Sequence, residues 1–278
     1  MNDNCRALGR EAALAAEHLA IGVTALGRAN YAQEAYYGQA FFALTVGLER
    51  SAKLAFVVDY ALDNAGKFPP SEELTPKKGF GHDIKRLLDR LDDIAERRGL
   101  SGTKHRLPRS EIHDAMIDIL SDFARNGTRY YNLEFVTGTP SAASKVDPLR
   151  QWWDRVVTPI LRIHYKTNIR RRHEANAEFI ERAFQGHARV RHESETGHAI
   201  NSVYEASRRT GATGFAAPYV RVYVMQIIRF LATLLSELGF VAQKQQLEDV
   251  PYLADYFAIF QNDDKYFKRK KTWSIYTP

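Results

Sequence analysis

The chain has 278 residues, of which 45% are hydrophobic and 12% aromatic, a composition typical of a folded globular protein that excludes a disordered one. Its 39 Lys and Arg outnumber 33 Asp and Glu, and much of this mild excess lies in residues 170–172 and 265–271. Cys5 is the only cysteine, which excludes an intrachain disulfide and a thiolate metal cluster.

No stretch of the sequence approaches the roughly 18 to 20 uninterrupted apolar residues that a membrane span requires. Residues 1–20 place acids and a histidine within their apolar run, which a signal peptide does not do. We therefore expect a soluble, cytoplasmic protein that makes no contact with a membrane.

The first half of the chain repeats apolar residues at intervals of three and four, which predicts amphipathic helices. The first helix is expected over residues 6–27 and the second over residues 31–62. Asn64-Ala65-Gly66 is expected to terminate the second helix, because glycine accepts the left-handed conformation of a helix C-cap. A loop containing three prolines follows at residues 67–81.

The third helix is expected to begin at residue 82 or 83 and to stop before Gly99. Ser110 is the expected N-cap of the fourth helix, which has acids in its first turn and leads into a polar motif at residues 125–132. Residues 137–148 are small, polar and bounded by proline, which indicates a linker.

Beyond the linker, residues 149–184 form one long helix or two helices joined at Pro159. Further helices are expected at residues 196–209 and 218–240, and a short C-terminal β-hairpin is expected across residues 262–264.

The sequence thus predicts an all-α fold with three parts. Residues 1–136 form a helical bundle, residues 137–148 are the linker, and residues 149–278 form a helical extension that ends in a basic tail.

Two short polar motifs flank the third and fourth helices: Gly81-His82-Asp83, and Arg125-Asn126-Gly127-Thr128-Arg129-Tyr130-Tyr131-Asn132. Arg125 and Arg129 share one helix face and offer bidentate donors that suit phosphates. Asn126 adds a donor and an acceptor, and Tyr130 and Tyr131 offer rings for base stacking. This chemistry suits a nucleotide or an RNA backbone. Alternatively, the motif only ends a helix, with Arg125 paired to an acid and the tyrosines packed on the bundle.

The two motifs resemble those of the HEPN superfamily, helical domains that often cut or bind RNA as dimers. Many members also carry a polar helix with Glu and Lys, which here corresponds to Glu49 and Lys53. Arg125-Asn126 is similar to the first half of the nuclease motif of the family. The resemblance covers roughly residues 30–136, and it implies a helical bundle, a homodimer, and a role in defence or stress response.

The chain departs from the family pattern where nuclease members carry a histidine after the arginine. Tyr130, Tyr131 and Asn132 occupy the corresponding positions, and tyrosine, with an unperturbed pKa near 10, is a poor base at pH 7. A general base would have to come from elsewhere, and His82 or His113 are the candidates.

The resemblance assigns roles to residues of both motifs. Arg125 would stabilise the phosphate in the transition state, Asn126 would position it, and Tyr130 would stand where the family has its base. Arg129, Tyr131, His82 and Lys53 would contact the nucleic acid. Glu49 and Lys53 are one helical turn apart, so they can equally form an ordinary ion pair.

A second group of polar residues lies at His187, His192 and His198. Their gaps of five and six residues differ from the i, i+4 spacing that places two metal ligands on one helix face. We interpret this stretch as a solvated polar segment, and we expect neither a metal nor another cofactor.

Three interpretations of function are consistent with the sequence. The first is an RNA- or nucleotide-binding protein, with or without metal-independent ribonuclease activity. The second is a non-catalytic helical interaction or scaffold protein with a protein partner, in which the polar motif serves only the fold. The third is a DNA-binding regulator that uses the basic tail.

Overall fold

A computed structural model of the chain describes residues 2–75, 81–100, 102, 104–125, 128–138, 145–184 and 187–275. Within these residues the regular secondary structure is helical apart from one short antiparallel pair of strands, so the predicted all-α class is confirmed. The α-helices are α1 Asp3–Leu26, α2 Ala35–Asp63, α3 Ile84–Arg97, α4 Glu111–Ala124, α5 Tyr131–Val136, α6 Pro148–Trp152, α7 Thr158–His164, α8 Thr167–Phe184, α9 Val203–Lys244, α10 Ala254–Phe257 and α11 Asp264–Arg269. The other elements are two 3-10 helices, η1 Ser71–Leu74 and η5 Ala258–Gln261, one π-helical turn, η4 Trp153–Val157, and two strands, β1 His192–Glu193 and β2 Ala199–Ile200.

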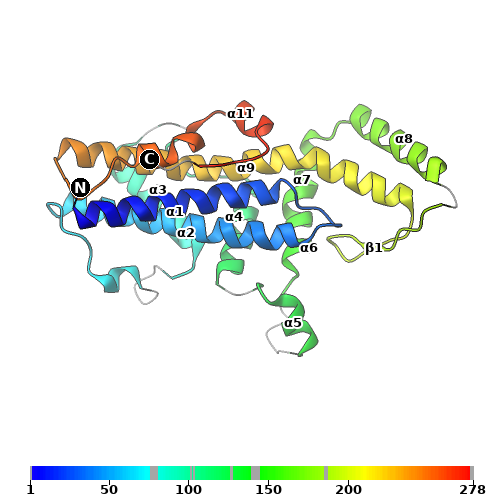
Figure 1. Ribbon diagram of the computed structural model, residues 1–278, viewed down its shortest axis with the longest axis horizontal. Helices are drawn as coiled ribbons and strands as arrows, with labels where there is room; N and C mark the ends of the chain where they lie inside the picture. The colour runs from blue at the N-terminus through cyan, green and yellow to red at the C-terminus, as the bar shows by residue number, and fades with distance from the viewer. Residues whose placement is uncertain are drawn as a thin grey trace.

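Three long helices, α1, α2 and α9, run side by side along the long axis of the molecule (Figure 1). Helices α3 and α4 pack against α2. Helix α8 and the β1–β2 pair lie at the end of the bundle away from the N-terminus, and α5 projects from one side (Figure 1). Helix α5, which begins at Tyr131 within the second polar motif, therefore stands out from the bundle.

Two glycines allow α1 and α2 to lie unusually close. A Cβ atom on Gly22 would come within 2.6 Å of Leu44 Cγ, and one on Gly47 within 2.8 Å of Leu19 Cγ. Carbon atoms that are not bonded prefer separations of about 3.5 to 4.0 Å, so a larger residue at either position would push the helices apart. This close contact fixes the rotation of α2 and therefore the face on which Glu49 and Lys53 lie.

The hydrophobic core is continuous along the bundle. Phe41 of α2 packs against Phe123 of α4 and Trp152 of α6, with ring centroids 5.6 and 5.0 Å apart. Buried residues from both sides of the expected linker belong to one hydrophobic cluster. The division at residues 137–148 stays a prediction, and residues 139–144 lie outside the described part of the chain.

The two helices predicted at residues 196–209 and 218–240 are wrong in their boundaries, because one helix, α9, covers Val203–Lys244. Pro218 lies inside it, where a proline removes a backbone hydrogen bond at a cost of roughly 3 kcal/mol. Ala216 and Val220 on either side of this proline are buried. The packing of α9 against α1, α2 and α8 offsets the cost of the proline.

Both alternatives for residues 149–184, one long helix or two helices joined at Pro159, are wrong. Segments α6, η4 and α7 form one helical run through this proline, and the chain breaks only at Tyr165 and Lys166, before α8. In η4, a π-helical turn, the N–H of Thr158 donates to the carbonyl of Trp153. This wider turn accommodates the ring of Pro159, which has no N–H to donate.

The β-hairpin predicted across residues 262–264 is wrong, because the Asp263 side chain caps α11 by accepting from the N–H of Tyr266 at 2.8 Å. An aspartate in this position satisfies an N–H that a helix start leaves unpaired. The basic tail is anchored rather than free, since Phe267 and Trp273 are buried and Lys268 Nζ lies 3.9 Å from the Tyr219 ring centroid. Truncation at residue 265 would remove core residues together with the charge.

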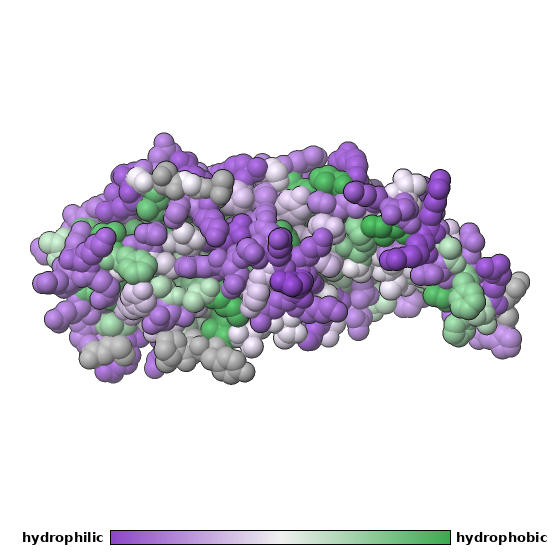
Figure 2. Space-filling model, turned by 90° about the horizontal axis from the view of Figure 1, so that it is seen from above, coloured by the Kyte–Doolittle hydropathy of each residue, from purple (hydrophilic) through white to green (hydrophobic). Residues whose placement is uncertain are grey.

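One helix in the described part of the chain has the length and composition of a membrane span. An 18-residue window of α9 has a mean hydropathy of 1.6, but 67% of that window is buried inside the protein. Figure 2 shows an outer face on which hydrophilic side chains predominate and apolar ones form separate patches. The core helix of a folded protein and a membrane span share this length and composition, and two thirds of the window in α9 is covered by the rest of the chain.

Candidate functional site

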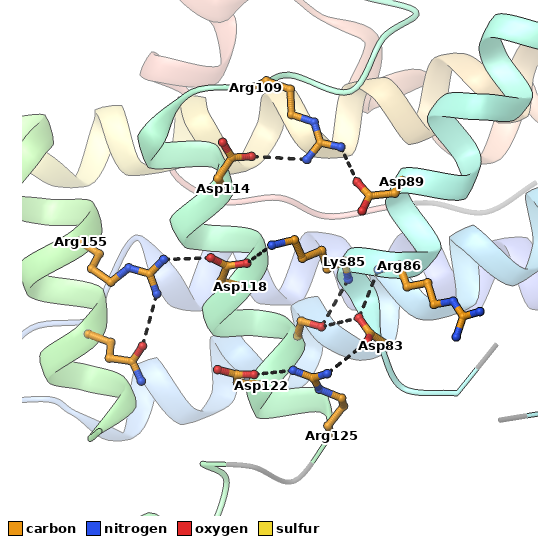
Figure 3. Close-up of polar contacts among 12 residues, drawn as sticks. Asp83, Lys85, Arg86, Asp89, Arg109, Asp114, Asp118, Asp122, Arg125 and Arg155 are labelled. Atoms are coloured by element: carbon orange, nitrogen blue, oxygen red, sulfur yellow. Dashed lines mark hydrogen bonds and ion pairs between the residues drawn. The ribbon is translucent and has the colours of Figure 1, made fainter. Parts of the chain in front are cut away.

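The structure brings the two polar motifs together at Asp83 and Arg125 (Figure 3). Asp83 is the N-cap of α3 and accepts from the N–H of Arg86 at 3.1 Å, while Arg125 is the C-cap of α4. Arg125 Nη1 lies 3.1 Å from Asp83 Oδ2, and its Nη2 lies 2.6 Å from Asp122 Oδ1. Residues 42 positions apart in the sequence therefore share one charged cluster.

Ser121 links the two helices at this cluster. Its hydroxyl donates to Asp83 Oδ1 at 3.0 Å and accepts from the N–H of Lys85 at 3.3 Å. Partial burial acts to raise the pKa of Asp83, but hydrogen bonds from the Arg86 N–H and the Ser121 hydroxyl, with the charge of Arg125, outweigh it and lower this pKa. Asp83 therefore stays ionised and anchors Arg125.

The charged row continues along α3 and α4 (Figure 3). Asp118 binds Lys85 at 2.8 Å and Arg155 at 2.9 Å, and Arg109 contacts both Asp89 and Asp114. A hollow of about 240 Å³ at this row is lined by three acids, three bases and a serine: Asp83, Asp118, Asp122, Lys85, Arg125, Arg155 and Ser121. The three negative and three positive charges of this hollow balance. This agrees with the alternative in which the motif only ends a helix and Arg125 pairs with an acid.

A second cluster is centred on Glu49 of α2. Glu49 Oε1 lies 2.6 Å from Lys53 Nζ, and Glu49 Oε2 lies 3.0 Å from His82 Nδ1. Partial burial acts to raise the pKa of Glu49, but the hydrogen bonds from Lys53 and His82 outweigh it and lower this pKa. Because ionised Glu49 can only accept, Nδ1 of His82 carries a hydrogen, and Nε2 of the neutral ring keeps its lone pair.

The His82 side chain is 62% exposed, whereas that of Glu49 is only 18% exposed. The carboxylate is thus held in the protein surface and orients a ring that faces solvent. His82 and Asp83 are neighbours in the chain, so the backbone links the His82–Glu49 pair to the Asp83–Arg125 pair. Each cluster contains one basic side chain that can meet a phosphate, Lys53 in the first and Arg125 in the second, and neither His82 nor Lys53 lines the hollow at Arg125.

The last five residues of the second motif, Thr128 to Asn132, line a different hollow. Asn126 lies outside the described residues. Arg129 lies over the rings of Phe42 and Phe123, with its Cζ 5.3 and 5.4 Å from their centroids. Arg129, Tyr130 and Tyr131 line a hollow of about 500 Å³, and none of them lines the hollow at Arg125.

Four carboxylates line that larger hollow: Glu34, Asp147, Glu193 and Glu195. Burial raises the pKa of Glu34, and the nearby negative charges of Glu195, Asp147 and Glu193 raise it further. Such a concentration of acids repels phosphate. The predicted nucleic-acid contacts of Arg129 and Tyr131 stay predictions, and the acids around these two residues disfavour them.

The histidines at 187, 192 and 198 do not gather around a common point. His192 packs edge-on against Tyr31 with ring centroids 5.7 Å apart, and His198 lines a hollow between α8 and α9. In the described residues no group of three or more His, Cys, Asp or Glu side chains is placed to hold a metal ion.

Sequence reasoning missed the partners that organise these clusters. The ion pair of Glu49 with Lys53, which the sequence offered as an alternative, is present, but the contact of Glu49 with His82 joins residues 33 positions apart and has no local signal. The sequence also gave no indication that Ser121 hydrogen-bonds Asp83 and Lys85. The pairing of Asp122 with Arg125 could have been found, because an acid and a base three residues apart lie on one helix face.

Replacement of Arg125 by alanine is expected to lower the free energy of unfolding by about 0.5 to 1 kcal/mol, because exposed ion pairs contribute little. Urea denaturation at pH 7 measures this loss, and Arg6→Ala, which breaks an exposed pair with Asp3, is the matched control. Ionised Asp83 contributes to the free energy of unfolding at pH values above about 3.8, its pKa in the unfolded chain. This contribution is lost as the pH falls through the lower pKa that Asp83 has in the folded protein. A loss above about 3 kcal/mol would show that Arg125 has a structural role these pairs do not explain.

Comparisons with known proteins do not extend the resemblance seen in the motifs. A search of protein-family models, of curated proteins and of solved structures finds no match to this chain. The likeness to HEPN domains therefore rests on the two motifs and the polar helix of Glu49 and Lys53, and it stays a prediction.

Proposed function

We propose that this chain binds RNA at the surface formed by Lys53, His82 and Arg125, and that it cleaves the RNA backbone without a metal ion. The observation that carries the proposal is the contact of His82 Nδ1 with Glu49 at 3.0 Å, on a ring that remains 62% exposed. A histidine oriented by a carboxylate through one nitrogen is equipped to move protons with the other. A role in defence or stress response follows only from the resemblance.

The expected reaction is internal transfer of the phosphodiester. Nε2 of His82 takes the proton of a ribose 2′-hydroxyl, whose oxygen then bonds to the adjacent phosphorus. The bond from phosphorus to the 5′-oxygen breaks, and water supplies the proton that this oxygen needs. The hydroxide that remains takes the proton from Nε2 of His82, which restores both. The products are a 2′,3′-cyclic phosphate and a 5′-hydroxyl, and no oxidant or cofactor is required.

Lys53 and Arg125 are the expected phosphate contacts, and each has N–H donors that its ion pairs do not use. Arg125 uses two of its five N–H donors on Asp83 and Asp122, and Lys53 uses one of three on Glu49. A phosphate can therefore bind without breaking the pairs that hold these side chains. The carboxylates weaken the local positive potential, so we expect moderate affinity with a clear dependence on salt.

RNA binding is tested by fluorescence anisotropy of a labelled single-stranded RNA over a series of salt concentrations. Log affinity falls as log salt concentration rises, and Lys53→Ala and Arg125→Ala are each expected to make this negative slope shallower by about 0.7. That is the value for one lost phosphate contact on a single strand. Arg6→Ala, on the exposed face of α1, is the control and should leave the slope unchanged. Equal slopes for all four proteins would contradict the proposed surface.

The expected homodimer is a second proposal, supported by one observation. Leu133, Phe135 and Val136 are 65, 68 and 82% exposed on α5, the helix that projects from the bundle (Figure 1). Apolar side chains gathered on a projecting segment are typical of a surface that another protein covers. A second copy of the chain is the partner that the resemblance implies.

Light scattering coupled to size-exclusion chromatography tests this dimer. The double variant Phe135→Ser and Val136→Ser is expected to halve the mass of the wild-type particle, because it removes the exposed apolar surface. Phe179→Ser, at a phenylalanine that is 67% exposed on α8, is the matched control and should leave the mass unchanged. A monomeric wild-type protein would refute the dimer.

A further inference from the structure

A separate hollow of about 320 Å³ lies between the start of α8, the β1–β2 pair and the start of α9. Trp153 and Ile200 contribute apolar surface to it, and Arg208 and Arg209 contribute charge. Its volume falls in the range of about 300 to 1,000 Å³ that small-molecule sites occupy. None of its lining residues belongs to the surface of Lys53, His82 and Arg125, so binding in this hollow is independent of the proposed RNA cleavage.

Arg209 forms a fixed flat surface in this hollow. Its guanidinium carbon lies 3.1 Å from the ring centroid of Trp153, and its Nε and Nη2 donate to Glu195 Oε2 at 2.9 and 2.6 Å. Glu195 is fully buried at its side chain and also accepts from the Tyr37 hydroxyl at 3.2 Å. An arginine held in this way costs little entropy when a flat ring stacks on it.

Tyr165 supplies a second ring to the hollow. Its hydroxyl lies 2.8 Å from Nδ1 of His173, which fixes the orientation of the phenol ring. Ser194 and His198 add side chains that can donate to and accept from polar groups. Together with Arg209, these groups match the faces and the edges of a nucleobase.

Three arginines and two carboxylates line the hollow: Arg170, Arg208, Arg209, Glu174 and Glu205. The arginines therefore exceed the acids by one, unlike in the larger hollow at Arg129. Among the described residues, Arg208 forms no ion pair with a carboxylate. Hydrogen bonds from Asn201 and Ser202 lower the pKa of the exposed Glu205, and Arg208 is near enough for its charge to lower this pKa further. Arg170 meets Glu174 at 3.3 Å in an exposed pair, so its remaining donors are available. Two arginines from different helices that border one hollow are suited to a terminal phosphate.

We propose that this hollow binds a nucleoside monophosphate. The base would stack on the plane of Arg209 and on Tyr165, and the phosphate would bind Arg208 and Arg170. The fixed Arg209 plane favours a flat aromatic ligand over an aliphatic anion, and the polar groups of Ser194 and His198 favour a base over a plain hydrocarbon ring.

Isothermal titration calorimetry of the full chain tests this site. The probes are the 5′-monophosphates of adenosine, guanosine, cytidine and uridine, together with adenosine and inorganic phosphate. At least one monophosphate is expected to bind more tightly than both adenosine and phosphate by tenfold or more, because only it engages the rings and the arginines together. Failure of every monophosphate to bind at millimolar concentration, or equal affinity for phosphate alone, would overturn the proposal.

Variants locate the binding. Arg208→Gln is expected to weaken the monophosphate by about tenfold or more, the effect of losing a charge-assisted hydrogen bond. Arg172→Gln removes the same charge from an exposed position of α8 that does not line the hollow, and it should change the affinity less than twofold. Arg125→Ala should also leave it unchanged, which separates this site from the RNA surface. Equal weakening by Arg208→Gln and Arg172→Gln would show that general charge, and not this hollow, attracts the nucleotide.

Discussion

Substitution of His82 by asparagine is expected to lower the rate of metal-independent RNA cleavage by about 10² to 10⁴-fold, the range that a positioned proton-transfer group contributes. An asparagine amide can still donate to Glu49, so the hydrogen bond at 3.0 Å is replaced rather than lost. It has no lone pair that accepts a proton near neutral pH. The measurement is single-turnover cleavage of end-labelled RNA in the presence of a chelator.

Glu49 and His105 provide the companion variants. Glu49→Gln is expected to reduce the rate less than His82→Asn, since the amide keeps the ring in place without stabilising its charge. His105 lies 3.8 Å from Glu237 in an unrelated His–carboxylate pair, so His105→Asn is a matched control that should keep full activity. Comparable loss in His82→Asn and His105→Asn would point to a general effect on the protein rather than to proton transfer at His82.

Replacement of Glu195 by alanine is expected to destabilise the protein by about 3 to 5 kcal/mol, because it removes a fully buried carboxylate and leaves Arg209, whose side chain is only 18% exposed, without its partner. Tyr37 would lose its acceptor as well. Burial raises the pKa of Tyr37 well above 10, and the charge of Glu195 raises it further, so this tyrosine is a protonated donor at neutral pH. Urea denaturation measures the loss.

Two further variants serve as controls for Glu195→Ala. Glu195→Gln keeps an acceptor for Arg209 and Tyr37 and should cost less than Glu195→Ala. Glu237→Ala breaks a half-exposed contact with His105 and should change stability by about 0 to 1 kcal/mol. If Glu195→Ala were as mild as Glu237→Ala, the pair with Arg209 would not anchor the β1–β2 segment to α9.

Much of the first half of the fold could be predicted because its signals are local. Ser110 accepts from the N–H of His113 at 3.3 Å, as expected of an N-cap. Gly66 adopts a φ of +83° after α2, which confirms the expected helix end. Apolar spacing together with these end signals located α1 to α4 to within a few residues.

The errors lie where packing overrides local preference. A helix was predicted to begin at residue 218, and one alternative placed a junction at Pro159, yet the buried surface of α9 and the π-turn of η4 continue the helix through both prolines. At the C-terminus, Asn262-Asp263-Asp264 fits either a hairpin turn or a helix cap. The burial of Phe267 and Trp273 favours the helix, and that burial cannot be read from neighbouring residues.

The candidate site could be predicted in part. The motifs located His82, Asp83 and Arg125, and chemistry suggested that Arg125 pairs with an acid, but no spacing identifies that acid as Asp83, 42 residues earlier. Glu49 was recognised only as the partner of Lys53. Contacts between helices depend on their relative rotation, which the close approach at Gly22 and Gly47 sets here.

The most direct test of the proposed function is incubation of the purified protein with end-labelled total RNA and a chelator, beside His82→Asn and His105→Asn. Cleavage by the wild type and by His105→Asn, with products that end in a 2′,3′-cyclic phosphate and loss of about 10²-fold or more in His82→Asn, is the predicted result. Intact RNA in every reaction, with all three proteins folded, would contradict cleavage at His82 and leave the surface of Lys53, His82 and Arg125 with at most a binding role.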